Sequence, residues 1–350
     1  MNTFEPVETN LMKKTLIVLI VLMLPASSFG GGFSKVGTAS AQFLKIGVGA
    51  RAAGMGGAFA AVSNDVSALY WNPAGMTALP SISVGFSHSQ WFAQMSHNFA
   101  GIAVPLGSND ALGVYAISLN TGEQEVTTVE KPDGAGIYYT VSDLAIGLSY
   151  ARSLTDRFSV GVTAKYIQQI AYNESASTVA LDIGTSLRTG FHNLVIGMCV
   201  SNFGGTMKLE GTDLIALADV NKSISGEYNP DARLKTEAFP LPLNFRVGIA
   251  MDVLGGMDPL LESESHRFTL ALDGNHPNDN NERVNIGGEY SWDETLFARF
   301  GYKINYDTEK WAIGAGVNVK VGSQRLAFDY SLVDFGNLGK VSRISLELQF

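Results

Sequence analysis

Few residues of this 350-residue chain are spaced in a way that could support chemistry. Gly47, Gly49 and Ala52 follow an apolar stretch, as they would in a dinucleotide-binding loop. That loop requires a strand, a tight turn and a helix within a parallel sheet. No crossover helix or parallel strand is expected after the motif, so the glycines are interpreted as positions of close backbone packing. No cofactor is expected.

The histidines are candidate catalytic residues of a hydrolase. His88 and His97 lie near one predicted connection, and His266 and His276 flank a predicted strand. No spacing joins any of them to a nucleophile, and a catalytic triad is recognised only by geometry. We therefore expect polar rim histidines and no catalytic residue. The single cysteine, Cys199, is assigned to packing, and no Cys/His set has metal-ligand spacing, so no metal is expected.

The composition narrows the class of protein. Hydrophobic residues make up 46% of the chain, which suits membrane strands that show every second residue to lipid better than it suits membrane helices. The formal net charge is -9. Nucleic-acid binding needs clustered Lys and Arg, so nucleic acid is not an expected partner.

Residues 1–30 are predicted to be a secretory signal peptide. Two lysines precede an apolar run from Leu16 to Leu24, which is about half of the roughly 20 residues that a spanning helix needs. Acidic residues stand ahead of the lysines, which favours the hypothesis that translation starts at Met12. The signal peptide therefore predicts that the protein is exported.

From residue 81 to residue 350 the chain shows a period of two. In 311–322, for example, apolar Ile313 and Val317 alternate with small or polar Gly314 and Asn318. Alternation over segments of about ten residues is typical of barrel strands that face lipid on one side and a lumen on the other. The pattern predicts an all-β antiparallel transmembrane barrel of fourteen strands, at 81–91, 96–106, 110–120, 142–154, 158–170, 178–189, 193–204, 239–253, 266–278, 282–292, 296–305, 311–322, 324–335 and 340–350.

The lengths of the predicted connections depend on whether they follow an even-numbered or an odd-numbered strand. Those after even-numbered strands are mostly short turns, whereas those after odd-numbered strands include the long 121–141 and 205–238. Bacterial barrels place short turns in the periplasm and long loops outside. The connection 254–265 does not fit, because it should be periplasmic yet is longer than a turn. The 205–238 loop suits an external lid or binding surface, with a solvated loop as the alternative.

A soluble β-sandwich would also alternate. Glycines on the polar faces of the strands disfavour it, because glycine weakens a solvent-facing sheet but fits a crowded interior. These glycines are Gly113, Gly147, Gly161, Gly184, Gly197, Gly248, Gly287, Gly301 and Gly316.

The segment 31–80 differs from the strands that follow it. Residues 43–79 are rich in Gly and Ala and carry few charges. A residue from Ser63 to Asp65 could cap a short helix from Val66 to Trp71. Asn72-Pro73 would end that helix and Gly75 would turn the chain. We predict a compact hatch inside the lumen.

Charged residues are also expected to face the lumen, and several are expected to bond to the hatch. They are Arg246, Asp252, Arg267, Asp273, Glu289, Arg299, Lys303, Asp329, Arg343 and Glu347.

Two strings, ARAAGMGGAF at 50–59 and ALYWNPAGM at 68–76, resemble the N-terminal signature of the PorV/PorQ outer-membrane family. NPAGM, with the preceding Asp65 and Ser67, is also similar to the hatch of FadL-type transporters, and 272–292 is similar to a later family pattern. The resemblance implies a fourteen-strand barrel with an N-terminal hatch in the bacterial outer membrane, at residues 81–350. The hatch residues at matching positions are Arg51, Gly54, Gly56, Gly57, Asp65, Asn72, Pro73 and Gly75.

The best-understood members of this family act in type IX secretion, where they receive exported proteins that carry a C-terminal sorting domain. The resemblance therefore implies a non-enzymatic barrel that engages cargo at the outer face. Its partners would be outer-membrane lipid, the outer-membrane assembly machinery, secreted cargo and secretion-system components. The terminal aromatic, Phe350, is predicted to be the assembly signal. The alternative is a FadL-like channel for hydrophobic small molecules, which would need an apolar pocket above a displaceable hatch.

Overall fold

A computed structural model describes residues 36–217 and 231–350. The predicted signal peptide at 1–30 and the proposed start at Met12 lie outside the described residues. Within the described ranges, no helix combines the length and the apolar character needed to span a bilayer.

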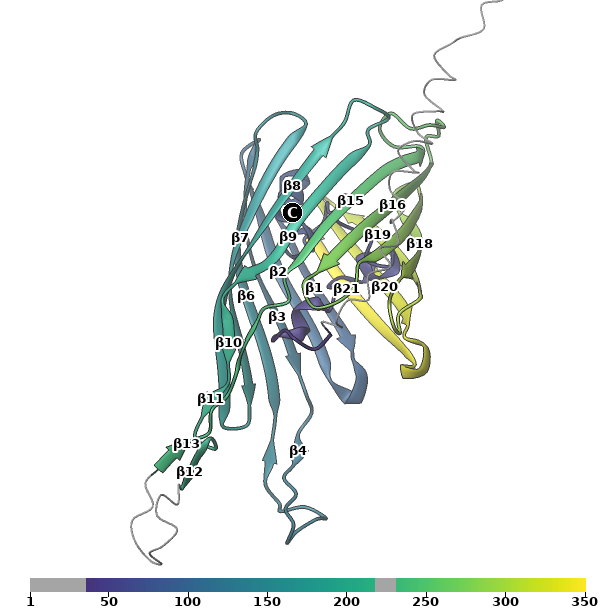
Figure 1. Cartoon of the computed structure of the whole chain (residues 1–350). Helices are drawn as coiled ribbons and strands as arrows, with labels where there is room; N and C mark the ends of the chain where they lie inside the picture. The colour runs from purple at the N-terminus through teal and green to yellow at the C-terminus, as the bar shows by residue number, and fades with distance from the viewer. Residues whose placement is uncertain (1–35, 218–230) are drawn as a thin grey trace, which may run out of the picture. The chain divides into compact units, whose positions relative to one another are not determined.

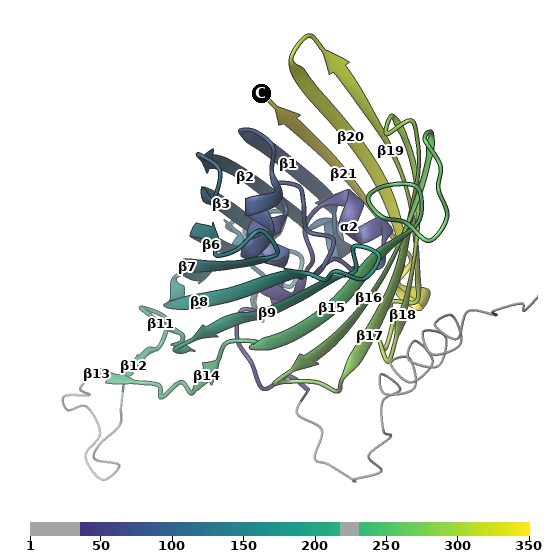
Figure 2. The same cartoon turned by 90° about the horizontal axis from the view of Figure 1, so that it is seen from above.

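One antiparallel sheet closes on itself (Figures 1 and 2), because β1 pairs with both β2 and the last strand, β21. Apart from the short β11, the ring contains fourteen strands, each paired with its neighbours in chain order. They are β1 (Ser83–Gln90), β2 (Ser96–Leu106), β3 (Asp110–Asn120), β6 (Val141–Ser153), β7 (Phe158–Ala171), β8 (Glu174–Arg188), β9 (Val195–Gly204), β15 (Asn244–Leu254), β16 (His266–Pro277), β17 (Arg283–Trp292), β18 (Leu296–Ile304), β19 (Trp311–Val321), β20 (Gln324–Asp334) and β21 (Lys340–Gln349).

The predicted fourteen-strand antiparallel barrel is confirmed, and β2 and β3 have the bounds expected from the alternation. The largest errors are at the starts of β8 and β15. β8 begins at Glu174 rather than 178, and β15 begins at Asn244 rather than 239. Ala238–Pro240 forms β14, which pairs with β10 (Thr206–Lys208) outside the barrel ladder, so the alternation continued into a different sheet.

Short strands in the long connections were not predicted. β4 (Gln124–Glu125) pairs with β5 (Tyr138–Tyr139), and β12 (Ile215–Leu217) pairs with β13 (Asp231–Arg233). β11 (Glu210–Gly211) extends the edge of β8. Two- or three-residue ladders carry no readable periodicity. They make two arms that project from one end of the barrel, at the bottom of Figure 1.

The two ends of the barrel differ. We call the end that carries the connections 91–95, 121–140 and 205–243 the loop mouth. The opposite end, which carries the short turns and the C-terminus, is the turn mouth. Long loops lie outside the cell in barrels of this kind. The connection 255–265, at the turn mouth, keeps the unusual length predicted for it.

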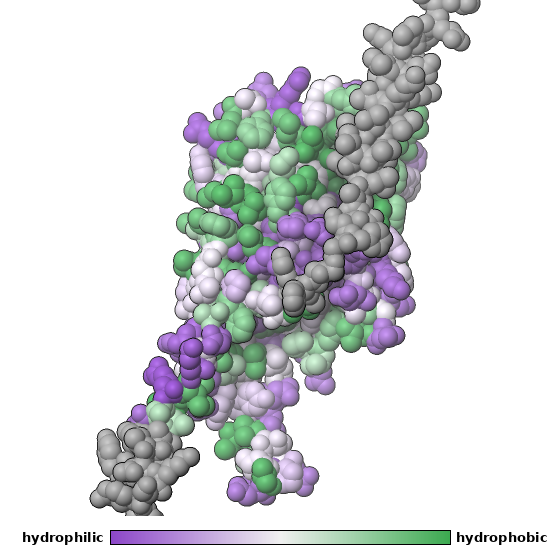
Figure 3. All heavy atoms as spheres, in the orientation of Figure 1, coloured by the Kyte–Doolittle hydropathy of each residue, from purple (hydrophilic) through white to green (hydrophobic). Residues whose placement is uncertain are grey.

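Burial alternates along the strands as the barrel requires. On β1, Val84 and Phe86 are exposed, whereas Ser83 and Ser87 are buried in the lumen. Hydrophobic residues cover much of the strand surface, and hydrophilic residues lie at its ends and on the projecting loops, which also carry some hydrophobic residues (Figure 3). An outward apolar band around a polar interior is the pattern of a membrane barrel.

The segment before β1 lies in the lumen. It contains η1 (Gln42–Lys45), α2 (Ala50–Gly54), α3 (Ala68–Trp71) and η2 (Pro73–Ala78), which pack against the inner faces of the wall strands. It contacts the loop mouth through Lys45 and Asp279 and then runs to the turn mouth, where β1 begins. Two further short helices, η3 (Phe92–Gln94) and η4 (Gly336–Leu338), lie in loop-mouth connections.

Two local predictions for this segment are corrected. The helix begins at Ala68 rather than Val66, because the Asp65 carboxylate accepts the backbone N–H of Ser67 at 2.9 Å and holds a turn there. Gly75 does not reverse the chain through a left-handed backbone position, since it lies within the 3-10 helix η2. A Cβ at Gly75 would lie 2.0 Å from the carbonyl oxygen of Ser63, so glycine is needed there for space.

The alternation can be tested with two neighbouring residues of β20. Phe328 faces outward with 46% of its surface exposed, and Ala327 faces the lumen opposite Glu347. Phe328→Arg should destabilise the inserted barrel by about 2–4 kcal/mol, because it places a charge in hydrocarbon. Ala327→Arg should cost much less, since it gains a carboxylate neighbour. Heat-modifiable migration and urea unfolding in lipid vesicles would measure both, and equal effects would contradict this orientation.

Candidate functional site

Wall glycines make room for the hatch, which we define as residues 36–79. A Cβ at Gly301 would lie 2.0 Å from the backbone nitrogen of Gly56, and one at Gly197 would lie 2.2 Å from the carbonyl oxygen of Ala60. Gly54 faces Gly314 in the same way, at 3.1 Å. Six of the nine glycines expected in a crowded interior are crowded by the hatch, four of them by its backbone. Gly147, Gly248 and Gly316 instead make room for side chains of the wall itself.

Arg51 joins the hatch to the wall through a buried ion network. Its Nε and Nη2 donate to the two Glu289 carboxylate oxygens at 2.8 and 2.7 Å, and its Nη1 donates to Asp65 at 3.1 Å. Glu289 also accepts from Arg299 at 2.6 Å, and Arg299 donates to Asp329 at 2.6 Å. Burial alone would lower the pKa of Arg51, but the adjacent Glu289 carboxylate outweighs it and raises that pKa. The guanidinium stays charged and bound.

A second anchor is a carboxylate without a bonded cation. Asp273 on β16 is fully buried and accepts the backbone N–H groups of Phe59 and Ala60 at 2.9 and 2.8 Å. Hydrogen bonds to a charged acceptor are among the stronger ones in proteins. The chain between α2 and α3 is therefore held by its backbone, so its side chains need not be polar.

Asn72 forms the third anchor, at the end of α3. Its Nδ2 donates to the carbonyls of Ala60 and Thr185 at 2.8 and 3.0 Å, and its Oδ1 accepts from the Ala74 backbone at 3.2 Å. Pro73 then occupies the first position of η2, where no backbone donor is needed. The side chain thus connects two parts of the hatch to strand β8.

The structure brings most of the sequence-predicted site residues together. Arg51, Gly54, Gly56, Gly57, Asp65, Asn72, Pro73 and Gly75 all lie in the hatch. Phe350 lies apart from them at the turn mouth, where its backbone N–H donates to Ile82 at 3.0 Å. Its part in assembly stays a prediction.

The lumen charges divide into three groups. Four contact the hatch directly, namely Arg246, Asp273, Glu289 and Glu347. Others pair within the wall, as Arg267 does with Asp252. The Nε of Arg343 has no hydrogen-bond partner among the described residues. The sequence did not single out Asp279, which accepts from Gln42 and Lys45 at 2.8 and 2.9 Å, because it lies in a turn rather than on an alternating strand.

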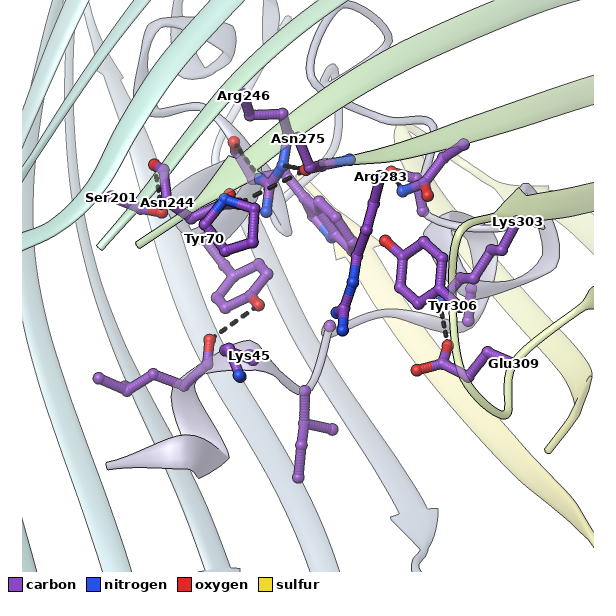
Figure 4. Close-up of a pocket in the computed structure, with 18 of the residues that line it drawn as sticks. Lys45, Tyr70, Ser201, Asn244, Arg246, Asn275, Arg283, Lys303, Tyr306 and Glu309 are labelled. Atoms are coloured by element: carbon purple, nitrogen blue, oxygen red, sulfur yellow. Dashed lines mark hydrogen bonds and ion pairs between the residues drawn. The ribbon is translucent and has the colours of Figure 1, made fainter. Parts of the chain in front are cut away.

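A cavity of about 320 Å³ lies between the hatch and the loop mouth (Figure 4). Cationic side chains converge on it, and Arg283 points into it between Tyr70 and Tyr306. The Tyr70 hydroxyl donates to Leu44 at 3.0 Å, and burial raises the pKa of Tyr70 to about 12, so the hydroxyl remains neutral. Trp91 and Phe335 supply an apolar side. The cavity is therefore amphipathic rather than uniformly apolar.

The histidines show no catalytic arrangement among the residues described. His88, His266 and His276 bond to Asn98, Tyr290 and Glu282 respectively. The prediction that His97 lies at a rim is wrong. Its side chain is buried in the lumen, because its position on β2 points inward. Within ranges 36–217 and 231–350, no cluster of His, Cys, Asp or Glu could hold a metal ion.

Comparisons with known proteins agree with this geometry. Residues 33–192 match the family model described as type IX secretion system protein PorV. Over these residues, which are just under half of the chain, the sequence is similar to the PorV family. Its barrel has the fold of FadL-like outer-membrane channels. No curated protein matches the chain.

Solved structures show the same fold at low sequence identity. The Ralstonia pickettii toluene transporter TbuX is similar with a TM-score of 0.54 and 13% identity, over 86% of this chain and 97% of that chain. The CymD monoaromatic hydrocarbon channel has a TM-score of 0.53 and 13% identity, over 87% and 98% of the two chains. A Pseudomonas aeruginosa FadL homologue has a TM-score of 0.50 and 10% identity, over 86% and 97%.

Removing the Arg51 side chain should loosen the hatch without opening the wall. Arg51→Ala leaves Glu289 with one bonded arginine and should weaken hatch docking by about 3–5 kcal/mol, as for other broken buried pairs. Single-channel recordings in planar bilayers should show larger or noisier conductance, with unchanged heat-modifiable migration. Arg267→Ala is the matched control, because Arg267 pairs only with Asp252 and Glu294 of the wall. Equal conductance of both variants would refute the role of Arg51.

Acid should release the loop-mouth end of the hatch. Burial raises the pKa of Asp279, but hydrogen bonds from Gln42 and Lys45 outweigh this and hold it below the ordinary value of 3.8. A lowered folded-state pKa means that the contact contributes fully above pH 3.8 and is lost as the pH falls through the folded value. Hydrogen exchange of residues 42–46 should therefore accelerate below that pH. Asp279→Asn should remove this pH dependence, and persistence of the dependence would contradict the assignment.

Proposed function

We propose that this protein assists type IX secretion by engaging exported cargo at the outer face of the membrane. The observation that carries the proposal is a lumen filled by an anchored hatch, beside arms that project from the loop mouth. A barrel closed in this way is better suited to binding at its outer end than to free diffusion through it. The similarity of residues 33–192 to the PorV family supports the same role.

The arms offer apolar contacts outside the lipid-facing wall. In the first arm, residues 121–140, Val129 is fully exposed and Tyr138 more than half exposed. In the second arm, whose described residues are 205–217 and 231–243, Leu234 and Phe239 are also exposed. Exposed apolar groups in aqueous loops mark surfaces that bind partners. Cargo with a C-terminal sorting domain and secretion-system components are the proposed occupants.

One observation favours a second candidate, a FadL-like channel for hydrophobic small molecules. The cavity above the hatch, with Trp91 and Phe335 on one side, lies where such a ligand would enter. The similar solved structures include proteins described as a toluene transporter and a monoaromatic hydrocarbon channel. Arg343 lines the cavity and has no bonded carboxylate among the described residues, so an uncharged ligand would leave its charge unpaired. Such a ligand would also have to displace the hatch, which the Arg51–Glu289 pair holds. Both observations weigh against the channel.

Shortening the first arm tests the cargo role. The backbone N–H of Thr121 donates to the carbonyl of Val141 at 2.9 Å, so residues 123–139 can be replaced by a short glycine turn without breaking the barrel ladder. The shortened protein should insert normally but capture few secreted proteins with a shared C-terminal domain in affinity purification and mass spectrometry. A Met257→Ser, Leu260→Ser variant at the turn mouth should capture them as the parent does. Undiminished capture by the shortened protein would contradict the proposal, and captured lipid or hydrocarbon alone would favour the channel.

We further propose that Phe350 is recognised by the outer-membrane assembly machinery. Support comes from its place after the strand that closes the ring and from its half-exposed ring. Normal membrane levels of a protein lacking Phe350 would refute this role.

A further inference from the structure

The connection between β15 and β16, residues 255–265, is not explained by the proposed function. It lies at the end of the barrel opposite the two arms (Figure 1). That end faces the periplasm, because long loops lie outside the cell in barrels of this kind. We call residues 255–265 the periplasmic loop. Three other connections at this end are much shorter and contain no hydrophobic residue, namely 107–109, 293–295 and 322–323.

The periplasmic loop exposes apolar side chains. Met257 is 66% exposed, Leu260 is 47% exposed and Leu261 is 62% exposed. The backbone of the loop is ordered around them, because the N–H of Leu261 donates to Val253 at 3.0 Å and the N–H of Gly255 donates to Leu261 at 2.8 Å. A group of exposed apolar side chains in an aqueous loop marks a surface that binds a partner.

Contacts with neighbouring strands hold the periplasmic loop in place. The Oδ1 of Asp258 lies 3.8 Å from the Nδ1 of His192 in the β8–β9 turn. At the base of the loop, a Cβ at Gly256 would lie 2.4 Å from the carboxylate of Asp252, which pairs with Arg267 at 3.0 Å. The apolar side chains are therefore carried by a held backbone, so a partner loses little loop entropy when it binds.

The charges beside these apolar side chains are negative. Asp258, Glu262 and Glu264 are all exposed, and the periplasmic loop contains no Lys or Arg. Glu262 and Glu264 form no hydrogen bond or ion pair with the rest of the described chain. The adjacent β17–β18 turn adds Asp293 and Glu294, which are also exposed. The surface thus combines apolar contacts with negative charge.

The basic residues nearby belong to other elements. Arg157 and Arg188 line the same turn-mouth cavity as Met257. They lie on the β6–β7 turn and at the end of β8, and neither pairs with a carboxylate in the part of the chain that the structure describes. The negative charge of the periplasmic loop is therefore not neutralised by these arginines.

This charge decides between the possible occupants of the surface. Phospholipid headgroups carry phosphate, so acidic side chains on both sides of Leu260 and Leu261 oppose insertion of the loop into the membrane. A second copy of the chain is disfavoured for a similar reason, because its formal net charge is -9. A segment with both basic and apolar residues suits the surface, since it pairs the carboxylates and covers the leucines.

We propose that the periplasmic loop docks a short segment of a periplasmic protein that is rich in basic and apolar residues. Three apolar side chains form a small surface, which suits a peptide segment bound transiently rather than a large permanent interface. This docking site goes beyond the proposed role at the outer face and does not depend on it.

Site-specific photo-crosslinking in intact cells tests the surface. The full chain carries the photoreactive residue p-benzoylphenylalanine in place of Leu260, and the adducts formed under light are identified by mass spectrometry. We expect a discrete adduct with a periplasmic protein, whose cross-linked peptide has a net positive charge and contains apolar residues. The same photoreactive residue in place of Leu154, which is 55% exposed on the β6–β7 turn, should not form this adduct.

Charge reversal shows whether the acidic groups take part. Glu262→Lys should reduce the yield of the Leu260 adduct by about fivefold or more, because it places like charges together. Asp156→Lys is the matched control, since Asp156 is an exposed acidic residue of the β6–β7 turn, and it should leave the yield unchanged. Both variants should keep heat-modifiable migration, because both side chains are exposed.

Several results would overturn the proposal. They are the absence of a protein adduct at position 260, an adduct with phospholipid alone, an adduct with a second copy of this chain, a cross-linked peptide with a net negative charge, and a yield that Glu262→Lys does not lower.

Discussion

The structure depends on one constraint, which is that hydrocarbon offers no hydrogen bonds to a backbone. Every N–H and C=O within the membrane must therefore be paired inside the sheet, and only a closed ring leaves no edge. The pairing of β1 with β21 meets this requirement by joining the first and last strands. Closure also fixes which side chains face inward, because a shift of one residue would exchange the lipid face and the lumen face.

Closure creates an interior that must be filled. A ring of this size would enclose a wide space, and here the space is occupied by the chain that precedes the wall. Small inward residues let that chain approach the wall backbone, and buried charges hold it at a few points, notably Glu289, Asp273 and the Thr185 carbonyl. The glycines of the wall thus leave space for the hatch, whereas the directional polar contacts fix the position of the hatch in that space. Neither would suffice alone, since apolar packing has little directional preference.

Most of the fold was predictable from the sequence because a strict period of two identifies strand, face and register together. The predicted site was partly right for a different reason. Residues such as Arg51 and Asn72 stand in a motif, but their partners Glu289 and Thr185 lie more than a hundred positions away, where only the closed topology brings them near. Gly75 shows the limit of sequence reasoning most clearly. A glycine can be required for a left-handed turn or for lack of space, and the sequence does not distinguish the two. In the structure the reason is space, because a Cβ would collide with Ser63.

The path of the hatch has a consequence for how the molecule is made. It contacts Asp279 at one end of the barrel and continues into β1 at the other, so it passes along the whole axis. The ring closes only when β21, its last strand in chain order, meets β1. Hatch residues are present throughout that process, and they display the Arg51 guanidinium and the backbone donors of Phe59 and Ala60 that later strands will contact. The hatch thus precedes the wall in the chain and carries the groups that the later wall strands contact.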